Sequence, residues 1–400
     1  MKSSRRNMAI LFATMVVVML GFGIIIPILP FYIESMGASG KELGLLMAAY
    51  AFMQLIFAPM WGSWSDRIGR KPILLVGVLG NALSLLLMGL ASQLWMLFAA
   101  RILAGVLSSA TLPTAMAFVS DSTSDEDRGG GMGLIGAAMG VGMILGPGLG
   151  GWLAAIDLSF PFYLAAGLSF LVMIFIYFAL PESLPEGRRS RETGKIKGLD
   201  VKQLWGALRG PLGYLMFLSF LLSFGMTNFE GIFGLYALER YGYGPSQVGT
   251  ILVVLGIVGA AVQMGLTGRL TKRWGERRVI QGSLALSAIG FVLMLSSTSF
   301  AAVLLTTGFY VTGQSLLRPA LASLISRRSH RAQQGMALGL HNSFMSMGRI
   351  VGPTWAGFAF DFNLMLPYIS GAITMLVGLG TTFVWLADKQ TEEFLDSAVG

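Results

Sequence analysis

Long apolar segments follow one another along almost the whole of this 400-residue chain. Each is about 20 residues long, which is the length that an α-helix needs to cross the hydrocarbon core of a bilayer. Only 12% of the residues are charged, about half the share that soluble proteins carry. We therefore predict an all-α membrane protein. Its expected spans are twelve, at about 8–30, 43–64, 73–91, 94–118, 132–156, 160–180, 211–238, 246–268, 279–297, 299–322, 335–358 and 364–387.

The basic residues predict how these spans are oriented. If the N-terminus lies in the cytoplasm, 23 of the 28 Lys and Arg residues fall in cytoplasmic loops or tails, and only Lys41 and Arg240 fall in outer loops. Such a bias indicates that both termini are cytoplasmic. The short loops favour a bacterial cell membrane, with the lipid bilayer as a partner. The net charge of +8 is then a topology signal, and we expect no nucleic-acid binding from it.

The residue types on which most enzymes rely are scarce. The chain has no Cys and two His, and it shows no metal-ligand spacing, phosphate-binding loop or nucleophile–base set. We therefore expect no metal, no cofactor and no enzymatic activity, and we assign no catalytic residue. A membrane-embedded enzyme is the weakest interpretation, and a sensor would need a sizeable soluble domain.

A charged segment with regularly spaced glycines joins the second and third spans. It reads GSWSDRIGRK at 62–71, and a degenerate echo reads GRLTKRWGERR at 268–278. The two glycines keep their spacing in both segments, and the sign of the charge is exchanged between Asp66 and Lys272 and between Arg70 and Glu276. Related turns at corresponding points of two halves indicate an internally duplicated membrane protein, an architecture that usually means transport.

The duplication predicts where the halves meet. We expect an N-terminal bundle of six helices at 1–187, a cytoplasmic linker at 188–208 and a C-terminal bundle of six helices at 209–400 with a short cytoplasmic tail. Residues 199–208 have apolar residues at helical spacing, which is typical of a helix that lies in the membrane interface.

The segment at 62–71 resembles the loop motif between the second and third helices of the major facilitator superfamily, G-x-x-x-D-R-x-G-R-[RK]. The resemblance implies the superfamily fold, in which two six-helix bundles are related by pseudo-two-fold symmetry. It also implies a gating role, with the carboxylate near a helix N-terminus and the basic groups paired with acids of the other half or with lipid phosphates. The alternative is that the charges only fix topology. The gating residues are Gly62, Asp66, Arg67, Gly69, Arg70 and Lys71.

A row of glycines runs along the fifth span and ends in the sequence GPGLGG at 146–151. A proline in mid-membrane bends a helix, and glycines around it let a neighbouring helix approach closely. The sequence resembles the antiporter motif of the superfamily's drug-efflux branch, and a related GRIVGP recurs at 348–353. The alternative is a kinked packing helix. The motif residues are Gly146, Pro147, Gly150 and Gly151.

Ionisable groups inside the bilayer are rare and usually functional. Of twenty acidic residues, only Glu230 lies in the middle of a span. A carboxyl group in an apolar environment keeps its proton to a higher pH than in water, so this residue is a candidate proton carrier. Arg101 resembles the superfamily's buried arginine, which is linked there to proton coupling, and Arg318 holds a comparable place in the tenth span. The alternatives are structural arginines and an inert, protonated carboxyl.

Other polar and aromatic residues within the spans are predicted to line a substrate cavity. The same residues can equally bridge or pack helices, and His341 is more simply a hydrogen-bonded packing residue than a proton relay. The predicted cavity residues are Gln54, Asn228, Phe229, Phe233, Gln263, His341 and Asn342.

Across nearly its whole length the chain resembles the multidrug antiporters of Gram-positive bacteria, in the drug:proton antiporter family. The resemblance implies proton-coupled export of amphipathic, often cationic drugs by alternating access, with drugs and protons as partners and one chain functional as a monomer. Ser315 stands where those pumps can carry a second acid. With one carrier acid, exchange of one proton for one monocation is electroneutral. The rival hypothesis is a narrow transporter for a sugar, an amino acid, a siderophore or a single antibiotic.

Overall fold

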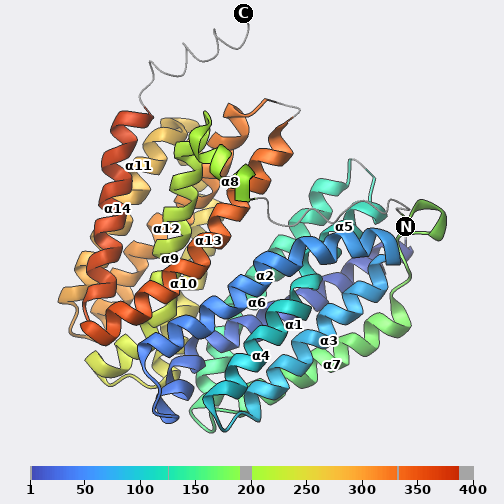
Figure 1. The fold of residues 1–400 in the computed structure, drawn as a ribbon, viewed down its shortest axis with the longest axis horizontal. Coiled ribbons are helices and arrows are strands. Elements are labelled where there is room, and N and C mark those ends of the chain that lie inside the picture. The colour runs from blue at the N-terminus through green and yellow to red at the C-terminus, as the bar shows by residue number, and fades with distance from the viewer. Residues whose placement is uncertain (1, 125, 190–200, 331–332, 387–400) are drawn as a thin grey trace, which may run out of the picture. The chain divides into compact units, whose positions relative to one another are not determined.

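The computed structural model describes residues 2–124, 126–189, 201–330 and 333–386, and all regular structure in these ranges is helical (Figure 1). Eleven of the described helices are long and apolar enough to cross a membrane. The predicted span at 335–358 falls in α13, which at 29 residues has the length to cross. Its polar residues, among them His341 and Arg349, keep it out of the group that is apolar enough by composition. The all-α prediction is confirmed.

The described helices fall into two compact units. The first comprises Met1–Asp200 with Phe233–Gly256, and the second comprises Val201–Ile232 with Ile257–Gly400. The first unit thus includes the end of the helix Gly213–Tyr241 and the start of the helix Pro245–Gly265. The predicted boundaries at 187 and 209 stay predictions, and residues 190–200 and 387–400, with most of the linker and the tail, lie outside the described residues.

The first unit is a bundle in which the most extensive contacts join α1 to α6 and α3 to α7. Its membrane-length helices agree with the predicted spans. They are α1 (Lys2–Ser35), α2 (Gly40–Ile68), α3 (Arg70–Gly89), α4 (Leu94–Leu107) continued by η1 (Ser108–Ala110) and α5 (Thr111–Ser122), α6 (Arg128–Ala154) and α7 (Phe160–Ala179), followed by the short η2 (Glu186–Arg188).

The fourth span is broken in the middle by a turn of 3₁₀-helix at Ser108–Ala110. Pro113 explains the break, because proline lacks the N–H that would bond to residue 109 and its ring crowds that carbonyl. The break positions three hydroxyl side chains in the interior, since Ser108, Ser109 and Thr111 are all buried.

The second unit is built on α11, which packs against both α12 and α14. The amphipathic segment predicted at 199–208 is the short helix α8, with Trp205 exposed. The helices described from residue 201 onward are α8 (Val201–Arg209), α9 (Gly213–Tyr241), α10 (Pro245–Gly265), α11 (Thr267–Ser296), α12 (Phe300–Arg328), α13 (Gln334–Phe362) and α14 (Leu366–Trp385).

The two units repeat the same internal packing at a constant interval along the sequence. In the first unit Ser108 donates a hydrogen bond of 3.4 Å to the Asn81 side chain, between η1 and α3. In the second, Gln314 donates one of 3.4 Å to the Ser287 hydroxyl, between α12 and α11. The donor and the acceptor of the second bond follow those of the first by the same number of positions, which we call the repeat interval. The glycines of the two charged turns have this interval too, so the duplication extends into the helices that pack beside the turns.

Candidate functional site

The junction between α2 and α3 is a single residue. Gly69 has φ +122°, a conformation that disfavours any residue with a Cβ, and a Cβ there would lie 2.5 Å from an oxygen of Glu182. The Glu182 carboxylate accepts hydrogen bonds from the backbone N–H of Arg70 at 2.8 Å and of Lys71 at 3.2 Å. An acid beyond the end of α7 therefore caps the N-terminus of α3, the position that favours a negative charge.

Arg70 is the centre of the charged network beside this junction. Its side chain is 8% exposed and pairs with Asp66 at 2.6 Å and with Asp121 of α5 at 2.8 Å. It also donates to the Ser65 hydroxyl at 2.6 Å. The partners of Arg70 thus belong to its own unit. The acid at the helix N-terminus is Glu182, whereas Asp66, which was expected there, pairs with Arg70. The remaining motif residues surround it: Gly62 and Arg67 lie on the last turns of α2, and Lys71 donates to the Tyr177 carbonyl at 2.7 Å.

The echo in the second unit has the same geometry with the charges exchanged. Gly275 interrupts α11 with φ +76°. The next residue, Glu276, is buried and accepts hydrogen bonds from Arg327 of α12 at 2.8 and 3.1 Å. Glu276 follows Arg70 by the repeat interval, and Arg327 follows Asp121 by the same interval. The structure therefore adds a partner to the sequence echo: the buried member of each ion pair and its more exposed partner both change sign.

The glycine ladder of α6 is the contact surface for α1. A Cβ at Gly146 would lie 2.7 Å from the Cα of Gly23 and from the Leu20 carbonyl oxygen, so only glycine fits. A Cβ at Gly150 would lie 2.9 Å from the Ile24 carbonyl oxygen. In the second unit Gly348 and Gly352 pack in the same way on α9, where a Cβ at Gly352 would lie 2.8 Å from the Phe224 carbonyl oxygen.

The other side of α6 packs on the beginning of α10 within the first unit. A Cβ at Gly151 would lie 2.8 Å from the Cα of Gly249, and one at Gly249 would lie 2.6 Å from the carbonyl oxygen of Pro147. The indole of Trp152 donates to the Thr250 hydroxyl at 3.0 Å. The antiporter-like sequence is thus held between two helices at backbone distance, which is what its small residues allow.

Arg101 lies in the interior of the first unit and lines a cavity of about 50 Å³. Its side chain is 2% exposed, and its guanidinium carbon lies 5.1 Å from the centre of the Tyr50 ring. Gln54, which also lines the cavity, donates to the Tyr50 hydroxyl at 3.2 Å. Two of the nitrogens of Arg101, Nε and Nη1, have no hydrogen-bond partner among the described residues.

Glu230 belongs to a different set of charges, in the second unit. The two cations whose charges act on its carboxylate are Arg349 and Arg318. Its own charge acts on the buried Tyr310. The predicted carrier acid and one predicted arginine are thus brought together, and Arg349, which the site prediction omitted, joins them.

The remaining predicted cavity residues differ in their surroundings, and their role in a cavity stays a prediction. Asn228 is buried and donates to the Pro367 carbonyl at 2.7 Å. Phe229 packs with its ring centre 4.8 Å from that of Tyr310, and His341 is buried with its Nδ1 2.8 Å from the Ser219 hydroxyl. Each of these contacts joins two helices, as the alternative interpretation of these residues expects. Of the others, Phe233 is 1% exposed, whereas Gln263 and Asn342 are exposed.

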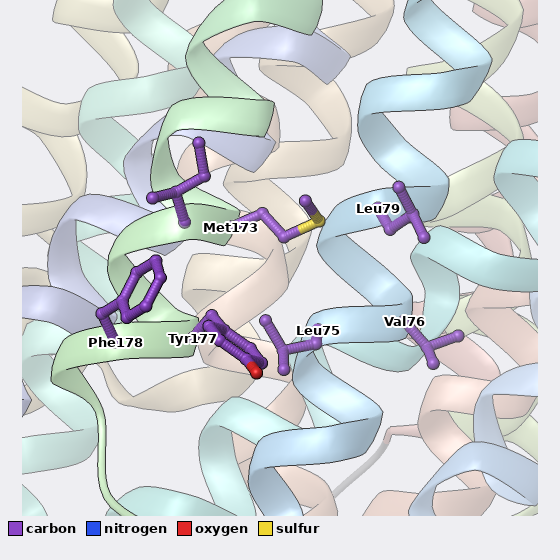
Figure 2. Close-up of a pocket in the computed structure, with 7 residues that line it drawn as sticks. Leu75, Val76, Leu79, Met173, Tyr177 and Phe178 are labelled. Atoms are coloured by element: carbon purple, nitrogen blue, oxygen red, sulfur yellow. The ribbon is translucent and has the colours of Figure 1, made fainter.

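A larger pocket lies elsewhere, between α3 and α7. It has a volume of about 320 Å³ and is lined by apolar side chains and Tyr177, with Met173 and Tyr177 of α7 opposite Leu75 and Leu79 of α3 (Figure 2). Several of its side chains are exposed on the surface of the bundle, Phe178 by 80%. It contains no group that carries charge or binds a proton at neutral pH, and it is therefore no candidate for the coupling chemistry.

The chain matches the Major Facilitator Superfamily over residues 11–267 and 215–398. It is 35% identical over 382 residues to Multidrug resistance protein 2 of Bacillus subtilis (strain 168), covering 95% of each chain. It is 33% identical to Multidrug resistance protein 1 of the same organism, covering 97% of this chain and 98% of that one. The Quinolone resistance protein NorA of Staphylococcus aureus is 28% identical, covering 96% and 97%.

Solved structures share the fold at low identity. The nucleoside transporter NupG superposes with a TM-score of 0.76 at 15% identity, covering 96% of this chain and 98% of that one. The human organic anion transporter MFSD10 (TETRAN) gives a TM-score of 0.69 at 22% identity, covering 95% and 99%. The likeness covers almost all of the chain and extends to transporters of quite different substrates, so it describes the fold alone.

Proposed function

The chain belongs to the Major Facilitator Superfamily, and from that premise we propose that it is a proton-coupled multidrug efflux antiporter. It exports amphipathic, often cationic compounds by alternating access. It is a multi-pass membrane transporter and not an enzyme. The observation that carries the coupling proposal is the placement of Glu230, the one mid-span acid, within reach of the charges of Arg318 and Arg349.

The relatives support the choice of substrate class. Three full-length relatives, between 28% and 35% identical, are named for multidrug or quinolone resistance. A pump for such compounds needs a site that tolerates many shapes. The attraction between a charged group and a cation depends less on direction than a hydrogen bond does, so a charged site suits this need.

The proposed cycle makes the proton and a cationic substrate compete for Glu230. On the outer side a proton neutralises the carboxylate and a bound cation leaves. On the inner side the proton leaves, and the anionic carboxylate accepts the next cation. Arg318 and Arg349 act on the same carboxylate. They stabilise its charge after proton release, because opposite charges attract strongly where water is scarce. Exchange of one proton for one monocation moves no net charge.

The location follows from the same proposal. The transporter lies in a bacterial cell membrane with both termini in the cytoplasm, as the distribution of Lys and Arg residues predicts. One chain forms the whole pathway and acts as a monomer.

A panel of unrelated fluorescent amphiphiles tests the substrate class. Cells that lack their own efflux pumps and express this chain should extrude several of them, and each should slow the export of the others. Collapse of the pH gradient with nigericin should stop extrusion. Export of one chemical class, with no competition between unrelated compounds, would contradict the proposal and support the narrow transporter.

A further inference from the structure

We propose that the groove between α3 and α7 binds one phospholipid of the inner leaflet, with an acyl chain in the groove and a negatively charged headgroup at Lys71. The proposal goes beyond the efflux function, because this ligand is not transported. It takes its orientation from the proposed topology, which places the turn between α2 and α3 and the end of α7 on the cytoplasmic side. Of the residues involved, only Lys71 belongs to the charged turn at 62–71.

The first support is that the groove has fixed ends. α3 and α7 are joined in mid-membrane, where Asn81 donates to the Ser169 hydroxyl at 2.9 Å, and at the cytoplasmic end, where Lys71 donates to the Tyr177 carbonyl at 2.7 Å. Between these two bonds α3 advances about 15 Å, at ~1.5 Å per residue. One leaflet has the same depth, since it supplies about half of the ~30 Å hydrocarbon core. The groove therefore has the length for one acyl chain.

The second support is the apolar lining of the groove. Its volume of about 320 Å³ lies within the ~300–1,000 Å³ that ligand clefts have. It opens on the outside of the bundle, where Tyr177 is 61% and Phe178 80% exposed. An apolar hollow does not hold water, and a helix face inside the bilayer meets hydrocarbon, so a lipid chain is the group that fills it. The apolar lining residues are Leu75, Val76, Leu79, Met173, Ile174 and Phe178 (Figure 2).

The third support is the positive charge at the cytoplasmic end of the groove. The Nζ of Lys71 lies 5.8 Å from the centre of the Tyr177 ring and gives one N–H to the Tyr177 carbonyl. Among the described residues Lys71 makes no ion pair. The acids of this turn pair with Arg70, and Glu182 accepts hydrogen bonds from backbone N–H groups. The other N–H groups of the ammonium can therefore donate to the oxygens of a phosphate.

The charge of Lys71 selects the class of headgroup. A phosphatidylglycerol headgroup is a net anion, whereas phosphatidylcholine adds a cation to the phosphate, and the ammonium repels it. The same repulsion disfavours a cationic drug in this groove. Tyr177 stands at the same end with an apolar ring and a polar hydroxyl, which is typical of the membrane–water interface. The occupant is therefore an anionic phospholipid.

The test measures lipid binding to the full purified chain by native mass spectrometry. The probes are phosphatidylglycerol and phosphatidylcholine with identical acyl chains, and the quantity compared is the ratio of their dissociation constants for the first lipid bound. The wild type should prefer phosphatidylglycerol. Lys71→Gln should lower this preference by about fivefold, and Lys71→Arg should keep it. Lys272→Gln, which removes an exposed lysine of the second charged turn, is the matched control and should leave the preference unchanged.

A second pair of variants tests the groove itself. Met173→Trp fills it and should weaken the binding of both lipids alike, by roughly threefold, because the acyl chain loses its packing contacts. Leu171→Trp is the control on the same helix, at a position that is 50% exposed and outside the groove lining. If Met173→Trp does not fold, the wild type decides the question: phosphatidylglycerol with a diazirine in mid-chain should cross-link to residues 75–79 and 173–178.

Equal binding of the two lipids to the wild type overturns the proposal, and so does a preference that Lys71→Gln leaves unchanged. Cross-links that map to other helices also overturn it. A dimer that Met173→Trp dissociates would assign the groove to a second copy of the chain. Competitive displacement of the lipid by tetraphenylphosphonium would assign it to a cationic substrate, and either result overturns the lipid site. None of these outcomes bears on the efflux function, which the panel of amphiphiles tests separately.

Discussion

The two units of the molecule share a scaffold and differ in their buried charges. Their glycines, prolines and interhelical hydrogen bonds recur at the repeat interval, as in Pro147 and Pro353. The mid-membrane charges do not recur: at this interval the counterpart of Arg101 is the buried Thr307, and that of Arg318 is Leu112. The duplicated chain has thus kept the positions that let helices approach and changed those that carry chemistry.

We propose that this difference divides the work of transport between the units. The first holds an arginine without a described counter-ion, beside a small cavity. The second holds an acid on which two arginines act. A proton carrier must exchange its charge, and the second unit offers the acid for it, whereas the first offers a fixed cation. Substitutions in the shared scaffold should therefore affect both units alike, whereas substitutions of the charged groups should tell the units apart.

The largest effect is expected from the shared close contact of the glycine ladders. Gly146→Val should destabilise the first unit by roughly 3 kcal/mol, because its side chain would meet the backbone of α1. Gly352→Val should do the same in the second unit. Gly136→Val is the control on the same helix as Gly146, since nothing lies within 4 Å of a Cβ there. Membrane yield and thermal unfolding measure the result, and equal behaviour of Gly146→Val and Gly136→Val would contradict the shared packing.

A smaller effect is expected where the two units carry opposite charges. Arg70→Glu should destabilise the first unit by about 2 kcal/mol, because it places an acid beside Asp66 and Asp121. The triple variant with Asp66→Lys, Arg70→Glu and Asp121→Arg copies the charges of Lys272, Glu276 and Arg327 and should recover most of the loss.

The melting temperatures of the single and triple variants measure this rescue. Thermal unfolding of the triple variant near that of the wild type would show that the two networks are equivalent in energy. A triple variant no more stable than Arg70→Glu alone would mean that the exchanged signs are not interchangeable, and the comparison of the two networks would fail.

The smallest effect concerns the helix cap. Glu182→Gln should cost about 1 kcal/mol, since the amide keeps one acceptor oxygen, puts a donor NH2 in place of the other, and loses the attraction of a negative charge to the helix N-terminus. The same substitution at Glu186, whose side chain is 90% exposed, is the control. Chemical denaturation of both proteins measures the difference, and a Glu182→Gln protein as stable as its control would remove the cap from the account.

The sequence predicts the scaffold well because apolar length and glycine spacing are local signals. The non-helical part of the turn motif is shorter than the sequence indicates, because α2 continues to Ile68 and only Gly69 leaves the helix. The partners of the motif could not be read in this way. Asp121 and Arg327 are far along the chain from the residues that they pair with, and only the common repeat interval links the two pairs.

The sequence predicted single residues of the candidate site, but it did not predict which of them lie together. Glu230 stood out because a mid-span acid is rare, and Arg349 was visible for the same reason. Nothing in the sequence showed that Arg349 acts on Glu230 with Arg318, or that Asn228 and His341 are occupied by neighbouring helices. Which face of an apolar helix points inward depends on tertiary packing. The sequence alone does not distinguish an aromatic residue that faces the interior from one that faces lipid.

The central claim is that Glu230 couples the proton to the substrate. The direct test uses purified protein in liposomes with an imposed pH gradient, and follows a fluorescent lipophilic cation and the lumenal pH together. The wild type and the Glu186→Gln control should move the cation against the proton, and Glu230→Gln should lose both movements. Cation transport that persists in Glu230→Gln and still follows the pH gradient would contradict the account.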